Sequence, residues 1–453
     1  MAGLKPTRPV ATGRQAARRR WWTAAAGTTL SVLGNALRDS LGVGMATTWS
    51  AFGARGFRVV WLAGLLSVAG DQLARVALSI LVFERTGSAA LSAATYALSM
   101  LPALVSGALL SWLADRYPRR RVMVACDVIR AALVAVMAVP AVPLPLMAVL
   151  LVLVQLAEAP FSAAQGAVLP ELLGARYEAG QAVQQVTTQL CLVLGFAAAA
   201  FVVTGVGAHA ALAIDAATFA ASALLIRAGL GSHPPPAAEG ESGATWWRRS
   251  WRRIAAGAVA VRRDRTLATL VWLGWLALFT VVPEGLAVPF AHQVGAGGEW
   301  IGVLLAAEPA GAVAGALLLR RVARPVRVRA LGVLAVGTSV PLVAFWGRPT
   351  LDAALALLFV SGLCSAYQVT AGATFVQLSP AGVRGRTLGF ARTGMIAGQG
   401  LGIVAGGVLA QLVGPAAAIA WAGTTGALVA FAAAAAWARR RPDAVSAALP
   451  AEA

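Results

Sequence analysis

The sequence predicts an all-α membrane protein with twelve transmembrane helices arranged in two pseudo-symmetric halves of six. Three observations lead to this prediction. Apolar stretches fill the chain from about Phe57 to Trp437, basic residues gather at alternate ends of these stretches, and two segments 208 residues apart repeat each other. A helix of about 20 apolar residues spans the roughly 30 Å hydrocarbon core of a bilayer. Twelve such stretches leave no room for a water-soluble core.

The apolar stretches are expected to be helices because long runs of Gly, Ala and Leu do not alternate as the strands of a membrane barrel do. The expected spans are 58–83, 88–112, 122–141, 145–168, 184–206, 208–228, 267–290, 300–319, 328–346, 351–376, 387–410 and 414–438.

The basic residues predict how these helices are oriented. All but four of the 37 Lys and Arg residues lie at or beyond one set of helix ends, the exceptions being Arg75, Arg85, Arg130 and Arg348. Positive charge marks the cytoplasmic side, so both termini are expected there. Because arginine is favoured so strongly over lysine, we interpret the composition as that of a GC-rich bacterium. We therefore expect a multi-pass protein of the bacterial inner (plasma) membrane.

Composition also limits the partners. The 453 residues are 59% hydrophobic and only 12% charged, whereas soluble domains carry roughly 25% charged residues. The formal net charge of +19 lies in loops on one side of the membrane, which favours the lipid bilayer over nucleic acid as the partner. The three cysteines and three histidines are far apart, so neither a disulfide framework nor a metal site is expected. No cofactor is expected, and the chain is expected to be a monomer.

The chain divides into five parts by composition. Residues 1–56 form a basic N-terminal extension, disordered or lying on the surface, because positive charge on both flanks of its mildly apolar stretch argues against crossing. Residues 57–228 form the N-terminal half and residues 267–438 the C-terminal half, followed by a cytoplasmic tail at 439–453. The two halves are joined by a cytoplasmic linker at 229–266.

The linker contains an amphipathic segment of tryptophan and arginine. One helical face would carry Trp247, Trp251, Ile254, Ala258 and Val261, with arginines on the other faces. This pattern is typical of a helix lying in the plane of the lipid headgroups, although its composition also fits a helix bound by a partner protein.

The internal repeat indicates that the halves share an ancestry. Residues 107–121 and 315–329 end the second and eighth expected spans, and seven of their fifteen positions are identical. Parallel halves related by an axis along the membrane normal, with a site between them, are a transporter architecture.

A family resemblance follows from the same segment. Ser111–Arg120 reads Ser-Trp-Leu-Ala-Asp-Arg-Tyr-Pro-Arg-Arg, which resembles the loop signature G-x-L-A-D-R-x-G-R-K/R of the major facilitator superfamily, with Ser111 and Pro118 at the two glycine positions. The residues Gly70-Asp71-Gln72 and the segment Phe83–Ser88 are similar to the branch that contains macrolide-efflux and enterobactin-exporter proteins. The span-five signature of proton antiporters is degraded here, and only Gly195 survives.

The resemblance implies a major facilitator fold and proton-coupled efflux, as in multidrug antiporters. It also implies a gating loop between spans two and three, made of Ser111, Asp115, Arg116, Arg119 and Arg120. In the family this loop is thought to hold span two against span eleven in the outward-open state. Arg392, early in span eleven, is a possible partner for Asp115 in this lock.

Charges inside spans are the candidate site residues, because each costs about 2.5–3.5 kcal/mol to insert. Asp71, Glu158 and Glu308 are expected near the midplane and Glu284 nearer the outer face. Asp71 and Arg75 lie four residues apart and therefore on one helix face, where they form either a mutually neutralising pair or a site for protons or substrate. The expected coupling residues are Asp71, Arg75, Glu158, Glu284 and Glu308. Asp127 and Arg130 are charges in the inner half of span three.

These observations favour a secondary transporter that exports amphipathic small molecules, such as drugs or secondary metabolites, by alternating access. The sequence contains no nucleotide-binding GxxxxGK[ST] loop, so the proton gradient is the expected energy source. An enzyme is not expected, because no HExxH, GxSxG or Asp-rich metal motif is present. The alternatives are a proton-coupled importer or uniporter of a small solute and a non-transporting scaffold on the same fold.

Overall fold

The computed structural model describes residues 51–110, 113–231, 243–380 and 382–448, and these residues form helices joined by short connections. Most of the predicted basic extension, the start of the linker and the end of the tail lie outside the described residues.

The first group of helices runs from residue 51 to residue 229. In chain order it contains η1 (Ala51–Gly53), α3 (Arg55–Thr86), α4 (Ala89–Leu98), α5 (Leu101–Leu110), α6 (Leu113–Arg116), α7 (Arg119–Met137), α8 (Leu144–Leu156), α9 (Glu158–Leu173), η2 (Gly174–Arg176), α10 (Tyr177–Val206) and α11 (Ala208–Gly229).

The helix α12 (Gly243–Arg263) precedes the second group. That group contains α13 (Arg265–Trp275), α14 (Ala277–Thr280), α15 (Val282–Gly285), α16 (Ala287–Gln293), α17 (Glu299–Arg320), α18 (Arg324–Val343), η3 (Ala344–Gly347), α19 (Leu351–Ser365), α20 (Tyr367–Leu378), α21 (Arg384–Val413) and α22 (Pro415–Ala448).

Ten helical segments among the described residues are long and apolar enough to cross a membrane. The remaining two expected spans are also helical but depart from that pattern. The range 88–112 is interrupted after α4, where Pro102 near the start of α5 cannot donate a backbone hydrogen bond. The helix α7 carries Asp127 and Arg130 in addition to three arginines in its first turn. The chain is therefore an all-helical membrane protein.

Proline also explains the short helices α14 to α16. Pro283 lies in the first turn of α15 and Pro289 in the first half of α16. Proline lacks a backbone N–H and clashes with the carbonyl four residues earlier, so a helix is interrupted around it. Glu284 lies between these prolines, and its carboxylate accepts a hydrogen bond from Tyr96 of the neighbouring helix group.

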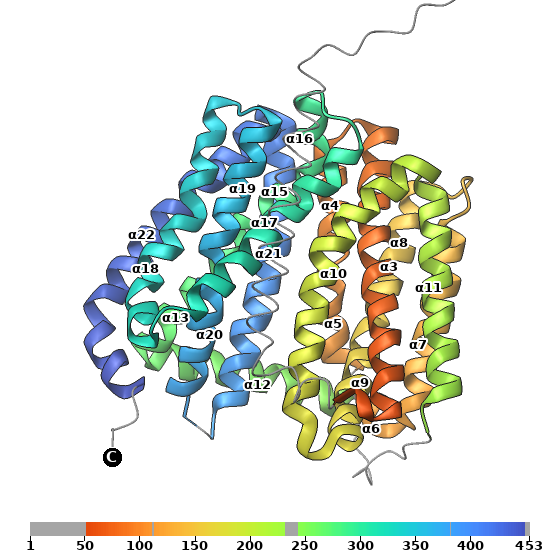
Figure 1. The fold of residues 1–453 in the computed structure, drawn as a ribbon, viewed down its shortest axis with the longest axis horizontal. Coiled ribbons are helices and arrows are strands. Elements are labelled where there is room, and N and C mark those ends of the chain that lie inside the picture. Colours follow the sequence, from red (N-terminus) through yellow and green to blue (C-terminus); the bar gives the residue numbers. More distant parts are fainter. Residues whose placement is uncertain (1–50, 111–112, 232–242, 381, 449–453) are drawn as a thin grey trace, which may run out of the picture.

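The two groups of helices lie side by side (Figure 1), with α3 to α11 in one and α13 to α22 in the other. The groups meet where α4 packs on α21 and α10 packs on α17. The end of the bundle that contains α16 is at the top of Figure 1, and the end that contains α12 is at the bottom. We refer to these as the α16 end and the α12 end.

The helix α12 packs against the bundle with one face. It contacts α21 of the second group and α5 of the first. Gly257 is buried against the backbone carbonyl of Arg386 and the side chain of Phe390, while Arg252, Arg262 and Arg263 are exposed. Val261 is also buried, and the placement of this helix in the plane of the lipid headgroups stays a prediction. The side chains of Trp247 and Trp251 lie outside the described residues.

Candidate functional site

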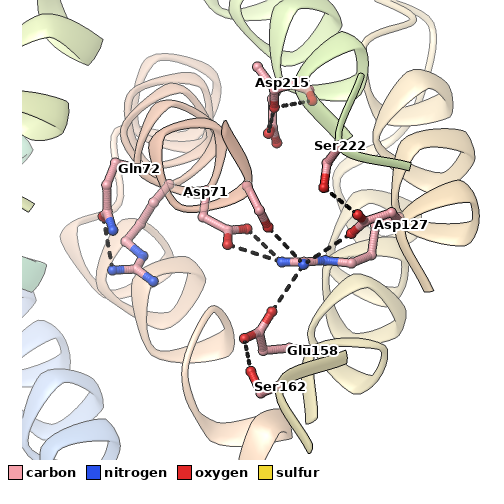
Figure 2. Close-up of polar contacts among 11 residues, drawn as sticks. Asp71, Gln72, Asp127, Glu158, Ser162, Asp215 and Ser222 are labelled. Atoms are coloured by element: carbon pink, nitrogen blue, oxygen red, sulfur yellow. Dashed lines mark hydrogen bonds and ion pairs between the residues drawn. The ribbon is translucent and has the colours of Figure 1, made fainter. Parts of the chain in front are cut away.

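A buried arginine in the middle of α7 is the centre of the candidate site (Figure 2). Arg130 is 0% exposed, and its guanidinium donates to both carboxylate oxygens of Asp71 on α3, each at 3.0 Å. It also donates to the Ser67 hydroxyl at 3.1 Å and lies 3.0 Å from a carboxylate oxygen of Glu158 on α9. The ring of Phe219 on α11 covers the guanidinium, with its centroid 4.1 Å from Cζ. Four helices therefore meet at one side chain.

A third carboxylate approaches Arg130 from its own helix. Asp127 lies one turn earlier on α7, 3.9 Å from the guanidinium, and is 0% exposed. The hydroxyl of Ser222 on α11 donates to its other oxygen at 2.5 Å. Ser162 donates in the same way to Glu158 at 2.6 Å. Hydroxyl groups thus orient two of the three carboxylates that share the one guanidinium.

The site borders a cavity of about 310 Å³. Asp71 and Glu158 reach it from the cluster around Arg130, while Trp61, Gln165, Gln184, Thr187 and Cys191 line it from α3, α9 and α10, and Arg392 lines it from α21. Trp61 and Gln184 lie in the first third of α3 and of α10, and both helices begin at the α12 end of the bundle (Figure 1). Glu158 is the first residue of α9. Asp71 and Glu158 keep 21% and 33% of their side-chain surface exposed, so both can meet a solute or a proton from the cavity.

Two amide groups on the cavity wall have unused hydrogen-bonding capacity. Within the described part of the chain, the Nε2 atom of Gln165 and the Oε1 atom of Gln184 are buried without a hydrogen-bond partner. One is a donor and the other an acceptor. A polar solute in the cavity would find both.

The predicted Asp71–Arg75 pair is not formed. Asp71 pairs with Arg130 instead, while the guanidinium of Arg75 donates to Gln72 at 3.2 Å and lies 5.4 Å from the ring centroid of Tyr96. A spacing of four residues brings two side chains onto one helix face, but the long arginine side chain can extend toward another helix. Here the partner from α7 occupies both oxygens of Asp71.

Arg75 belongs to a second set of contacts, between the two helix groups. The Tyr96 hydroxyl on α4 donates to Glu284 on α15 at 2.6 Å. Nearby, the Ser88 hydroxyl donates to Gln411 of α21 at 3.2 Å, and the rings of Phe83 and His292 lie 4.9 Å apart. Ser88 precedes α4, Phe83 lies near the end of α3 and His292 lies in α16. The groups are therefore joined by side chains at the α16 end, opposite the cavity.

The remaining predicted residues lie elsewhere. Glu308 is on α17, half-buried, with Gly362 of α19 packed against its backbone. In the gating loop, Arg119 binds the Ala167 carbonyl and the carboxylate of Glu171 at the end of α9, so it ties the loop to its own helix group. Arg116 is exposed and Arg120 half-buried. Ser111 and the side chain of Asp115 lie outside the described residues, and their pairing with Arg392 stays a prediction.

Sequence reasoning did not find Ser67, Phe219 and Ser222. Ser67 lies four residues before Asp71 and so shares its helix face, a spacing that could have indicated it. Phe219 and Ser222 on α11 give no such signal, because only packing brings them to α7. Within the described residues, no group of three or more His, Cys, Asp or Glu side chains is arranged to hold a metal ion.

Comparison with known proteins identifies the family. Residues 60–287, just over half of the chain, match the Major Facilitator Superfamily. The chain belongs to this superfamily. It is also similar to the uncharacterized MFS-type transporter YkuC of Bacillus subtilis (strain 168), with 26% identity over 244 residues, 52% of this chain. The match spans 55% of the length of that relative. Membership of the superfamily favours a membrane transporter over an enzyme.

Solved transporter structures share the fold. A peptide transporter POT in complex with sulfate superposes with a TM-score of 0.68 at 13% identity, covering 87% of this chain and 96% of that one. A bacterial homolog of the human lysosomal transporter Spinster, inward-facing and unoccupied, gives 0.62 at 14% identity, covering 88% and 99%. The nucleoside transporter NupG gives 0.65 for its D323A mutant at 15% identity, covering 84% and 99%. At these identities the likeness concerns the fold alone.

Proposed function

We propose that this chain is a secondary active transporter that exports small organic molecules in exchange for protons. One observation carries the proposal: a single buried arginine is shared by Asp71, Asp127 and Glu158, and two of these carboxylates border a cavity. Burying negative charge without a matching cation costs free energy. Binding a proton, or a solute with positive charge, relieves that cost.

The membrane-embedded region contains more acidic than basic side chains, and this excess supports proton binding. Arg75 and Arg130 are the cations deep in the described helices, and they are accompanied by six carboxylates, those of Asp71, Asp127, Glu158, Asp215, Glu284 and Glu308. Intramembrane carboxylates of this kind mark proton relays in transporters. The excess of acids therefore favours protons as the coupling ion.

The cavity suggests how proton and solute exchange. The proton and the solute both reach Asp71 and Glu158 through this cavity, so they compete for the same carboxylates. A solute binds when these groups are charged, and protonation weakens its hold while also loosening the Asp71–Arg130 pair. Competition for a shared site is sufficient for antiport, because the two ligands then take turns in crossing.

The arrangement of the halves fits one state of an alternating-access cycle. We propose twelve spans in two six-helix halves, 57–228 and 267–438, with both termini and the α12 end in the cytoplasm of a bacterium. The cavity then opens toward the cytoplasm, while Tyr96 and Glu284 close the outer side. Rocking of one half against the other would reverse this arrangement.

A second candidate function is proton-coupled uptake of a small polar solute. The unpartnered amide atoms of Gln165 and Gln184, with Thr187 and Arg392 nearby, favour a solute that forms hydrogen bonds. Export of amphipathic molecules is supported instead by Trp61 and Phe161, which give the same cavity an aromatic side.

The test measures accumulation of ethidium and of a macrolide in cells that express wild type, Asp71→Asn or Asp352→Asn, with and without a protonophore. Export predicts lower accumulation than in vector controls, lost with Asp71→Asn or the protonophore and retained with Asp352→Asn, whose residue lies in the first turn of α19. Equal accumulation in wild type and vector, with the protein confirmed in the membrane, would overturn the export of such molecules and favour uptake of a polar solute.

A further inference from the structure

A second, smaller cavity lies on the other side of Asp71. It has a volume of about 10 Å³, which is the lower limit for one water molecule. Its lining includes the polar side chains of Asp71, Arg75, Ser99, Gln155 and Asp215. A buried water needs two to four polar partners, and this lining provides them.

Asp215 is the least expected member of this lining. Asp215 is 1% exposed, and within the described part of the chain its Oδ2 atom has no hydrogen-bond partner. Its other oxygen accepts a hydrogen bond from Thr218 at 3.3 Å. A buried carboxylate oxygen without a hydrogen-bond partner costs free energy. A hydrogen-bond donor in the small cavity would remove this cost for Oδ2.

The backbone of α3 is shaped to bring Asp215 close to Asp71. A Cβ atom at Gly70 would overlap both Asp215 and Thr218. Glycine at this position therefore lets the polar face of α11 approach α3 one residue before Asp71. Figure 2 shows Asp215 on the far side of Asp71 from Glu158.

We infer that Asp71 and Asp215 share a proton through one water held in this small cavity. The inference rests on the proposed proton coupling and adds a residue and a route to it. Asp71 lines both cavities, so it can receive a proton from the larger one. The water then accepts the proton of the Asp71 carboxyl while it donates one of its own to Oδ2 of Asp215. Asp71 is left as a carboxylate, and Asp215 becomes the carboxylic acid.

The surrounding charges give this transfer a direction. Arg130 and Asp127 face Asp71 from α7, and Glu158 faces it from α9. Arg75 faces the small cavity from α3, with Tyr96 of α4 beside it and Glu284 of α15 bound to Tyr96. Once the proton moves to Asp215, Asp71 regains the charge that pairs with Arg130.

The test follows the carboxyl bands of the purified full-length protein by infrared difference spectroscopy during a pH titration. Two groups that share a proton titrate as a pair and not singly. Each single variant, Asp71→Asn or Asp215→Asn, should lose part of the carboxyl signal. We expect the sum of these two losses to differ from the loss in the double variant. As a control, Asp71→Asn and Glu308→Gln should add, since those carboxylates lie in different helix groups. Additive signals for Asp71 and Asp215 would overturn the inference.

A further variant tests the water site without removing either carboxylate, so that misfolding of the Asp variants cannot explain the result. Gln155→Leu keeps both carboxylates but removes a polar group from the small cavity, and it should turn the coupled titration into two independent ones. A water band that shifts in H₂¹⁸O and disappears in both Asp215→Asn and Gln155→Leu is also expected, and a band unchanged in both would contradict the water site. A different result would contradict the proposed function itself, namely transport by the wild type in proteoliposomes without any movement of protons.

Discussion

Asp71 and Arg130 form a two-oxygen ion pair, 3.0 Å long at each contact, between residues that are 59 positions apart in the sequence. The pair ties α3 to α7 and lies where a buried cluster meets a cavity. Both hydrogen bonds come from one guanidinium nitrogen, Nη2, and charge-assisted hydrogen bonds of this kind are roughly twice as strong as neutral ones. Because Asp71 is partly exposed and Arg130 is not, the carboxylate is the member that can change partners.

The first prediction concerns the role of Arg130 in stability. Arg130→Gln leaves Asp71, Asp127 and Glu158 without their shared cation, and breaking a buried ion pair from one side costs about 3–5 kcal/mol. We expect a large loss in the free energy of unfolding, measured for the purified protein by denaturant titration. Adding Asp71→Asn should restore part of it, because one uncompensated charge is removed.

The matched control for this prediction is Arg392→Gln. Arg392 also faces the larger cavity but is exposed, so its removal should leave the free energy of unfolding nearly unchanged. Equal losses in the two arginine variants, or a double variant less stable than Arg130→Gln alone, would contradict the cluster as described.

The sequence predicted the helices better than it predicted the contacts between them. Runs of apolar residues and the arginine pattern are properties of single helices, and the described helices occupy the expected ranges. The charged residues of the site were also found, because any charge in a span is costly. The pair of Asp71 with Arg75, one of two interpretations, is not seen, since helix periodicity reports a shared face but not which neighbouring helix supplies the partner. Phe219 and Ser222 on α11 carry no charge, and no sequence pattern indicated that they pack against α7.

The second prediction concerns the contact between Tyr96 and Glu284. A hydrogen bond to a charged group contributes about 1.5–3 kcal/mol, and this one joins the two helix groups at the α16 end. Tyr96→Phe removes the hydroxyl and keeps the ring beneath Arg75. We expect it to shift the population by about tenfold or more toward states that are open at the α16 end. Distances between spin labels placed on α4 and α21 should lengthen at that end, and unchanged distances would count against a closing role.

The third prediction concerns the packing of α10 on α17. A Cβ atom at Gly302 would overlap the backbone carbonyl of Phe196 and the side chain of Ala200. Gly302→Ala should therefore destabilise the closed arrangement by about 1–3 kcal/mol through overpacking, measured as a lower melting temperature. Gly372 on α20 is the control, because a Cβ there meets no atom within 4 Å. Gly372→Ala should be neutral or stabilising by up to about 1 kcal/mol, and equal effects at both sites would argue against a packed interface.

The fourth prediction uses Cys191 to find the side from which the larger cavity opens. Cys191 lines that cavity, whereas Cys126 is buried and Cys364 lies in the other helix group. In a Cys126→Ser/Cys364→Ser background, a membrane-impermeant maleimide should label Cys191 quickly in inside-out vesicles and slowly in intact cells. Cys191→Ser in the same background gives the zero level. Adding Tyr96→Phe should slow labelling in inside-out vesicles, because fewer molecules then open toward the α12 end. Labelling that is faster in intact cells than in inside-out vesicles would contradict a cavity that opens mainly toward the cytoplasm.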